Sequence, residues 1–335
     1  MKIGLHLNEE VFRKTVDIVA SIEKEAEIDE ILINLINNKI FISDQLFLLL
    51  QKLADEYYIS SNSNKIKIEK EIPENYKEEL VKYLVEKVKK LSNKVFFSAL
   101  DISKFFQCQR RFFLEKVVKS EQKKTRSSFE GEVFHKMAYL MINNYNKLPL
   151  EQLVPSVTER VIKEYQNKAK VEKEKLLNSA SFLNQIFSKY KFKYIIPEPY
   201  FVSLQAGLIA TPDILAISEK EIVPIDLKMG SLRVKEALRI QLLAEAVVIE
   251  KFFRKEVSSS MIISLLKRKV FKLNFSPQEK EKIFIIKKQI EKTLLKNIVP
   301  PMSNLPNFRK VVCPFCHVKE VCDTIEEVKK LIKLK

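Results

Sequence analysis

Glycine is scarce in this chain, with four glycines among 335 residues. No Gly/Ser-rich linker is visible, so domain boundaries have to be inferred from the hydrophobic pattern. No apolar run approaches the ~18–20 residues of a membrane-spanning helix. The first residues, MKIGLHLNEEVFRKTVDIV, carry acids where a signal peptide has a continuous apolar segment. We therefore expect a cytoplasmic protein with no membrane partner.

Cysteine and histidine are also few, with four and three residues respectively. In a reducing compartment, four cysteines are expected to be metal ligands or core residues rather than disulfides. The hydrophobic content of 46% and the aromatic content of 10% are typical of a folded globular protein. A chain of this length is expected to form one large domain and a small one.

Positive charge is in excess but unevenly distributed. Residues 1–100 hold 15 Lys and Arg against 17 Asp and Glu, whereas residues 101–335 hold 44 against 26. A basic excess of this size indicates a polyanionic partner for the second region, with nucleic acid as the leading candidate. The alternative is a lysine-rich surface that only contacts solvent.

The pattern of apolar residues predicts a region at residues 1–97 and a main domain at 98–335. In the first region, amphipathic helices precede two short strands around residues 61–64, and a further helix covers 74–92. This order favours either a small winged-helix-like module or a plain helical extension. In the main domain we expect helices at 98–119, 127–146 and 150–192, strands at 194–204, 207–217 and 221–228, a helix at 234–254, strands at 258–266 and 270–274, and a helix at 277–297. The predicted fold class is α/β, with a mixed sheet flanked by helices.

The predicted strands carry the clearest chemical pattern. Side chains alternate along a strand, so Asp226 and Lys228 share one face while Ile225 and Leu227 point into the core. Asp213 reaches the same face if the preceding strand is a neighbour. Two close carboxylates favour a divalent cation between them, and a lysine beside it can act on water or on a phosphate. The alternative is an ordinary Asp/Lys pair at a strand end.

Two further residues belong to the same pattern. His135 lies on a helix before the sheet, and with the two aspartates it completes a site of mixed nitrogen and oxygen ligands. Gln241 lies on the helix after the sheet, where an amide can hydrogen-bond an attacking water. Each residue alone is equally consistent with an ordinary core or surface position.

In order along the chain, these motifs resemble the RecB-like branch of the PD-(D/E)xK nuclease superfamily that carries an iron–sulfur cluster. The resemblance is strongest to CRISPR-associated nucleases of Cas family four and to exonuclease V. It runs from Ser98 to Cys322. Its motifs are the segment SALDISKFFQCQRRFF at 98–113, Gly131-x3-His135, Gly207 to Asp213, PIDLKMG at 224–230, Gln241, Pro300-Pro301 and the C-terminal cysteine triplet.

The resemblance implies functions for particular residues. It implies that His135, Asp213, Asp226 and the carbonyl of Leu227 bind Mn²⁺ or Mg²⁺. It also implies that Lys228 is the catalytic lysine and Gln241 the motif glutamine. Family members cut DNA, often single strands from an end, and the CRISPR-linked ones trim spacer precursors, so CRISPR adaptation proteins or DNA repair are the implied settings.

The chain departs from the family pattern at three positions. Glu245 stands where the family usually has tyrosine, Gln109 where it has proline, and Ala210 where a glycine is common. The predicted metal ligands and lysine are unaffected. Glu245 puts the rate, substrate binding or polarity of cleavage in question more than the chemistry.

The four cysteines are arranged as one upstream residue and a distant triplet, CPFCHVKEVC. Cys108 precedes the C-x2-C-x5-C of Cys313, Cys316 and Cys322 by 205 positions. This arrangement suits a [4Fe-4S] cluster better than zinc, which is usually held by two C-x2-C pairs. Haem attachment through Cys313, Cys316 and His317 would need an exported protein and would leave two cysteines unexplained. We expect a cluster that joins the ends of the nuclease domain.

Arg110 and Arg111, among phenylalanines, are candidates for DNA contact. Two functional classes then remain. The first is a metal-dependent DNA nuclease, expected to be an exonuclease on single-stranded DNA. The second is a non-catalytic DNA-binding or adaptor protein that keeps the fold and the cluster. Intact His135, Asp213, Asp226 and Lys228 favour the first, and Glu245 leaves room for the second.

Overall fold

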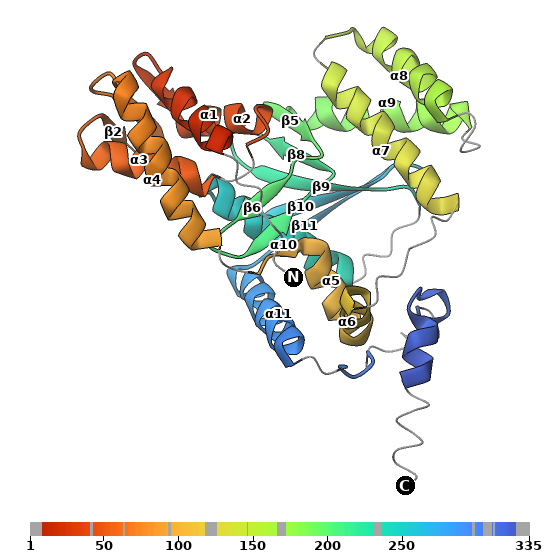
Figure 1. Ribbon diagram of the computed structural model, residues 1–335. Helices are drawn as coiled ribbons and strands as arrows, with labels where there is room; N and C mark the ends of the chain where they lie inside the picture. The colour runs from red at the N-terminus through yellow and green to blue at the C-terminus, as the bar shows by residue number, and fades with distance from the viewer. Residues whose placement is uncertain are drawn as a thin grey trace. The chain divides into compact units, whose positions relative to one another are not determined.

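The structure is a computed structural model that describes residues 9–40, 43–62, 64–92, 95–117, 126–145, 147–165, 172–230, 236–296, 299–303, 310 and 312–325. The chain divides into two compact units (Figure 1). Unit 1 comprises residues 1–98, 199–211 and 247–256, and unit 2 comprises 99–198, 212–246 and 257–335. Each unit is therefore built from segments that are distant in the sequence.

The N-terminal part of unit 1 alternates helices with a small sheet. Its elements are α1 (Glu9–Ala20), β1 (Glu25–Glu27), α2 (Ile28–Asn37), α3 (Asp44–Asp55), β2 (Ile59–Asn62), β3 (Lys65–Ile68) and α4 (Glu74–Ser92). The three strands pair antiparallel in the order β1-β3-β2. Helix α3 is apolar on most of its surface and buries Leu46, Phe47, Leu49, Leu50 and Leu53. The helices thus form around a core to which the hairpin contributes Ile59 and Ile66.

The rest of unit 1 comes from later in the chain. Strands β4 (Phe97–Ser98), β7 (Leu208–Ala210) and β6 (Phe201–Ser203) form a second three-stranded sheet. Two contacts link these later segments to α3. The Leu204 amide donates a hydrogen bond to Asp44 Oδ2 at 3.2 Å, and the Arg254 guanidinium lies 3.6 Å from the centre of the Phe47 ring.

Unit 2 is built on a five-stranded mixed sheet in the order β11-β10-β9-β8-β5. Its strands are β5 (Tyr194–Pro197), β8 (Ile214–Ile217), β9 (Ile222–Lys228), β10 (Ser259–Ser264) and β11 (Lys269–Asn274). Only β9 and β10 pair in parallel, with Asp226 opposite Ile262. A parallel pair needs a crossover, and α10 (Glu236–Phe253) provides it.

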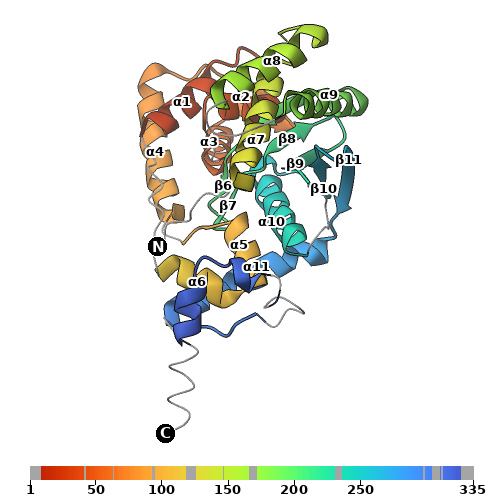
Figure 2. The same ribbon diagram turned by 90° about the vertical axis from the view of Figure 1, so that its right-hand side faces the viewer.

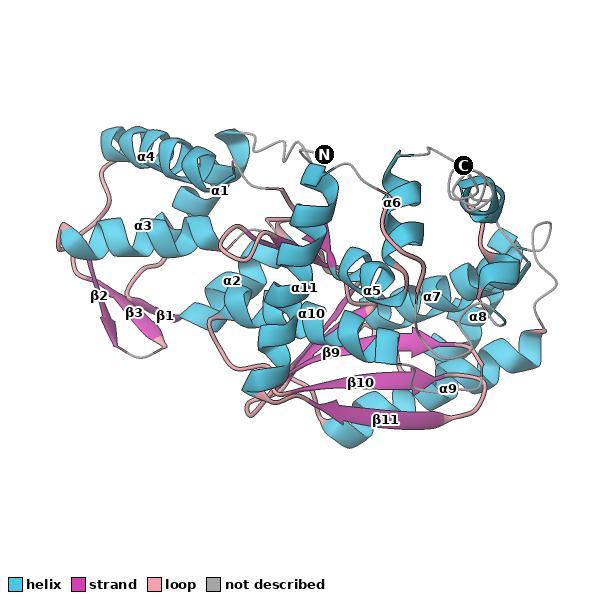
Figure 3. Ribbon diagram, turned by 90° about the horizontal axis from the view of Figure 1, so that it is seen from below, coloured by secondary structure: helices cyan, strands magenta, loops and turns pink. Residues whose placement is uncertain are grey.

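The helices of unit 2 are α5 (Ala99–Gln107), α6 (Gln109–Val117), α7 (Arg126–Asn144), α8 (Leu150–Tyr165), α9 (Lys173–Tyr190) and α11 (Pro277–Lys296). Figure 2 shows α7, α8 and α9 grouped together, and Figure 3 shows β9, β10 and β11 running side by side. At the start of α10, the Ser103 hydroxyl of α5 donates a hydrogen bond to the Ala237 carbonyl at 2.8 Å. Helix α5 therefore packs beside the crossover helix.

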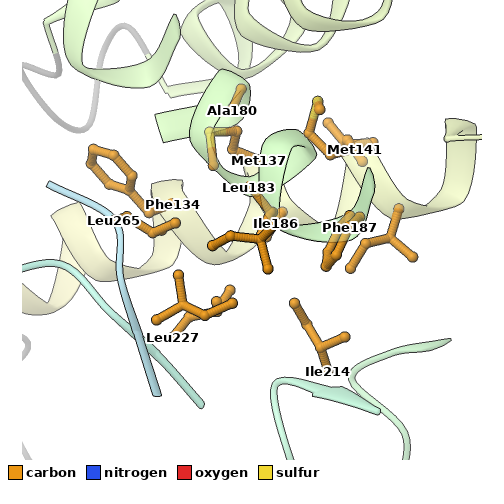
Figure 4. Close-up of a cluster of buried hydrophobic side chains, with 14 of the residues drawn as sticks. Phe134, Met137, Met141, Ala180, Leu183, Ile186, Phe187, Ile214, Leu227 and Leu265 are labelled. Carbon is orange, nitrogen blue, oxygen red and sulfur yellow. The ribbon is translucent and has the colours of Figure 1, made fainter. Parts of the chain in front are cut away.

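The main core of unit 2 lies between the sheet and helices α7 to α9 (Figure 4). Phe134 and Met137 of α7 and Leu183 and Phe187 of α9 meet apolar side chains of the strands, among them Leu227. Alternate residues of β9, Val223, Ile225 and Leu227, all belong to this core. Because side chains alternate, Asp226 and Lys228 point to the opposite face of the sheet.

The prediction of an α/β fold with a mixed sheet flanked by helices is confirmed. Four predicted elements are divided in the structure, and one of them, the helix predicted at 98–119, is observed as the two helices α5 and α6. The strands predicted at 194–204 and 207–217 each split, into β5 and β6 and into β7 and β8, because the chain passes from one sheet to another near Pro199 and Pro212. The predicted helix 150–192 is two helices, α8 and α9. None of the helices in the described ranges is long and apolar enough to span a bilayer.

Candidate active site

The two aspartates are brought together by a β-hairpin. Strands β8 and β9 pair antiparallel, with Ile214 opposite Ile225, and the turn closes where the Ser218 amide bonds the Glu221 carbonyl. One step beyond Ile214 and Ile225, the same register places Asp213 next to Asp226. The sequence predicts that Asp213 reaches Asp226 if their strands are neighbours, and β8 and β9 are neighbours in the sheet.

Asp213 is held by the backbone of the neighbouring strand. Its Oδ2 accepts a hydrogen bond from the Leu227 amide at 2.6 Å. The amide and carbonyl of one strand residue point to the same side. The Leu227 carbonyl therefore faces the side of β9 on which Asp213 lies. A cation bound by Asp213 would need its backbone oxygen ligand on this side.

Lys228 and Asp226 form an ion pair on the face away from the main core. Lys228 Nζ lies 2.9 Å from Asp226 Oδ1 and 2.8 Å from Oδ2. Asp226 is buried, at 4% exposure, whereas the Lys228 side chain is 41% exposed. The carboxylate is thus fixed inside the protein, and the ammonium group lies at the opening to solvent.

Two helices complete the site. His135 of α7 approaches Asp213, with 3.4 Å between Nδ1 and Oδ1. Gln241 and Glu245 of α10 are four residues apart and share one face of the helix. Gln241 Nε2 donates a hydrogen bond to Glu245 Oε1 at 3.1 Å. Glu245 is 2% exposed, and its Oε2 has no hydrogen-bond partner among the residues that the structure describes.

Burial of several acids in one place shifts their pKa values. Burial, assisted by the Asp226 charge, raises the pKa of Asp213 to about 6, although His135 acts in the opposite direction. Burial also raises the pKa of Asp226, against the influence of Lys228. Burial raises the pKa of Glu245 to about 8, and Asp226 and Asp213 add to this effect. Burial alone would lower the pKa of Lys228, but Asp226 outweighs it, so the pKa lies above its ordinary value.

These residues fit a divalent cation by their chemistry. Carboxylate and carbonyl oxygens with an imidazole suit Mg²⁺ and Mn²⁺, and a buried carboxylate oxygen without a partner is otherwise costly. Within the described residues, no group of three His, Cys, Asp or Glu side chains is arranged around a common metal position. In the structure, Asp213 accepts a hydrogen bond from the Leu227 amide and Asp226 accepts one from Lys228.

The four cysteines line a single cavity of about 40 Å³. Cys108 lies between α5 and α6, whereas Cys313 opens a short 3₁₀ helix (Cys313–Phe315). The cavity wall also includes Leu114, Met302 and Val318. No disulfide joins any two of these four cysteines. Burial raises the pKa of Cys316, and Cys108 and Cys322 contribute in the same direction. Four thiols at one apolar cavity suit a soft metal centre, although they are not drawn together around one position.

The arginines beside Cys108 have internal partners. Arg110 is 2% exposed, its Nε donates a hydrogen bond to the Pro300 carbonyl at 2.8 Å, and its Nη1 lies 3.9 Å from Cys322 Sγ. This burial contradicts the predicted DNA contact of Arg110, because a guanidinium inside the protein cannot reach a phosphate. Arg111 pairs with Glu115 at 2.7 Å.

His317 does not line the cysteine cavity. Its Nε2 lies 3.3 Å from Glu115 Oε1, in the network that also holds Lys104 and Arg111. Burial lowers the pKa of His317, against the effect of Glu115. The histidine of the C-x-x-C-H sequence is therefore engaged with a carboxylate of α6.

Glu245 is the site residue whose position the sequence did not indicate. The sequence showed it only as a departure from a motif, and a glutamate on a helix is usually a surface residue. One signal was available: residues 242–244 and 246–249 around it are all apolar. A single acid in an apolar stretch of helix indicates burial, and burial of an acid indicates a functional site.

The mixed sheet, the Asp-x-Lys of β9 and the second aspartate on the adjoining strand define a class of α/β protein built for phosphodiester chemistry. The comparison with family models agrees. The model of the PD-(D/E)XK nuclease superfamily matches residues 96–323, about two thirds of the chain. The chain belongs to this superfamily. No curated protein matches it in sequence.

Proposed function

We propose that the protein is a divalent-metal-dependent deoxyribonuclease that removes nucleotides from the ends of single-stranded DNA. The observation that carries this proposal is the grouping of His135, Asp213, Asp226 and Lys228 within a chain of the nuclease superfamily. The basic excess of residues 101–335 supports a polyanionic substrate.

In the proposed mechanism, His135, Asp213, Asp226 and the Leu227 carbonyl hold Mn²⁺ or Mg²⁺. When bound, the ion would supply an activated water and charge stabilisation at the scissile phosphate. Lys228 pairs with Asp226 and extends its ammonium group toward solvent, where it would stabilise negative charge that develops on the phosphate. Gln241 would orient the attacking water with its amide oxygen, since its amide nitrogen binds Glu245.

We further propose that Cys108, Cys313, Cys316 and Cys322 bind a [4Fe-4S] cluster. The support is that all four thiols line one cavity although they come from two ends of the nuclease region. Arg110, buried beside Cys322, would offset the negative charge of the cluster. The cluster would hold the C-terminal segment against α6, a structural role rather than a redox one.

The first region, residues 1–97, is proposed as a winged-helix-like domain that precedes the nuclease domain at 98–335 in the sequence. The order helix–strand–helix–helix–strand–strand and the sheet order β1-β3-β2 support this proposal. In such modules the third helix often enters the DNA major groove. Here the third helix, α3, is largely buried and residues 1–100 carry a net negative charge. DNA reading by α3 is therefore not part of the proposal.

The central experiment uses anaerobically purified protein and DNA labelled at either end. Linear single strands, a circular single strand and blunt duplexes are incubated with Mn²⁺, Mg²⁺ or EDTA. We expect metal-dependent shortening of linear single strands and an intact circle. Cleavage of the circle would contradict exonuclease action. Binding of DNA without cleavage by the wild type would favour the adaptor function instead.

The cluster and the biological setting need separate measurements. Iron and acid-labile sulfide in the anaerobic protein would support the cluster, whereas stoichiometric zinc would overturn it. A place in CRISPR spacer acquisition rests on the resemblance alone. It predicts that the protein co-purifies with CRISPR adaptation proteins, and a role in DNA repair predicts that it does not.

A further inference from the structure

Glu245 is a buried acid whose hydrogen bonding is incomplete. It is 2% exposed, and Oε1 accepts a hydrogen bond from Gln241 at 3.1 Å, while Oε2 has no partner within the described part of the chain. A buried carboxylate oxygen without a partner destabilises the folded protein, so such a group calls for an explanation, and a bound ion that satisfies it is one.

The electrostatic surroundings show which site Glu245 faces. Its charge interacts with Asp226, Asp213 and Lys228, which come from β9 and the residue before β8. Helix α10 carries Glu245 four residues after Gln241, on the same helical face. The carboxyl group of Glu245 therefore belongs to the carboxylate site and not to a separate surface feature.

When no cation is bound, the carboxylates of this site outnumber its positive groups. Among the described residues, three carboxylates, Asp213, Asp226 and Glu245, share one lysine, Lys228. Ionised together, they leave an excess of two negative charges, which one divalent cation would neutralise. Carboxylate oxygens are also the ligands that Mg²⁺ and Mn²⁺ prefer.

We propose that Glu245 supplies a further carboxylate oxygen to the divalent-cation site of His135, Asp213 and Asp226. This inference rests on the proposed nuclease function and extends it, because it adds a ligand from α10 to a site otherwise made by α7 and the β8–β9 hairpin. Glu245 is then a ligand of the cation, and not only a buried residue of the core.

The test is the affinity of the protein for Mn²⁺, measured by titration calorimetry on protein freed of divalent ions with its cysteine site intact. Glu245→Gln keeps the size of the side chain and removes one charge. We expect it to weaken Mn²⁺ binding by about 10-fold or more. The matched control is Glu236→Gln, the same change on an exposed residue of the same helix. It should bind Mn²⁺ as the wild type does.

Thermal unfolding separates this role from a purely structural one. Without metal, Glu245→Gln should unfold at the wild-type temperature or above it, because a buried acid has been removed. With Mn²⁺, its gain in unfolding temperature should be smaller than that of the wild type. A variant that binds Mn²⁺ with unchanged affinity would overturn the inference.

A direct measurement on the wild type guards against a variant that does not fold. Anomalous diffraction from crystals soaked in Mn²⁺ should place a Glu245 oxygen among the ligands of the ion. An ion held without Glu245 would refute the inference while leaving the proposed function intact. A wild type that neither binds Mn²⁺ nor cuts DNA would instead remove the proposed function, and with it the basis of the inference.

Discussion

The carboxylate site and the cysteine site of unit 2 are built in opposite ways. The carboxylates lie on a β-hairpin whose other face packs in a core of 24 buried residues. The cysteines come from residue 108 and from 313–322, and within the described residues the cluster beside them has three buried members, Phe113, Leu114 and Val318. A large core can hold charged groups in place before any ligand binds. A small one depends on its ligand for stability, so the two sites should respond differently to the same kind of change.

The largest effect is expected at the centre of the carboxylate site. Asp226→Asn removes the charge that Lys228 and the cation share, and we expect DNA cleavage to fall by about 10³-fold. The free energy of unfolding should change little or increase, because the substitution removes a buried charge. Single-turnover rates and urea unfolding measure the two effects. The control is Glu219→Gln in the exposed turn of the same hairpin, which should leave both unchanged.

At the cysteine site the expected effect is on stability. Cys316→Ser should prevent cluster binding and remove a link that joins segments about 200 residues apart in the sequence. By analogy with a covalent cross-link, the free energy of unfolding should fall by about 4 kcal/mol. Iron content and chemical unfolding provide the measurements. Equal stability of the variant and the iron-loaded wild type would refute the structural role of the cluster.

A smaller loss of activity is expected from Lys228. Lys228→Met removes the ammonium group but leaves the acids, so we expect cleavage to fall by about 10²-fold. Mn²⁺ affinity should remain or increase, because a cation that competes for Asp226 is gone. Lys228→Arg, which keeps the charge, should recover part of the rate. A variant that loses rate only through lost Mn²⁺ binding would show that the lysine serves the metal and not the phosphate.

The smallest effect is a pH dependence of stability in the metal-free protein. Asp213, with a pKa of about 6, and Glu245, with a pKa of about 8, hold protons in the folded state that they release at lower pH when unfolded. Stability should therefore decrease as pH rises from about 4.5 to 8. One pKa unit corresponds to about 1.4 kcal/mol, and both shifts exceed one unit, so we expect the free energy of unfolding to fall by more than this over the range.

Urea unfolding in EDTA at several pH values measures this slope. Glu245→Gln should remove its upper part, between about pH 6 and 8. Mn²⁺ should flatten the slope in the wild type, because a bound cation keeps the acids ionised. Stability that increases over this range without metal would show that the two acids are ionised in the folded protein.

Much of the fold could be predicted because local patterns and tertiary structure agree. The helix predicted at 277–297 and the strand predicted at 221–228 are observed as α11 and β9 within one residue at each end. The predicted strand 207–217 is divided because its two halves pair in different sheets, which depends on partners far away in the sequence. Short-range patterns contain no information about such partners.

The sequence by itself determined the chemical inventory: the Asp-x-Lys of β9, the aspartate before β8, the histidine of α7, and one cysteine with a distant triplet. It also determined that Asp226 and Lys228 share one face of β9, because strand side chains alternate. Only the tertiary structure decided where Arg110 and Glu245 lie. An arginine next to phenylalanines and a glutamate on a helix are each consistent with surface or interior. Their burial follows from the packing of α6 and α10 against distant segments, so contacts across the fold, and not local preference, place one at the cysteines and the other at the acids.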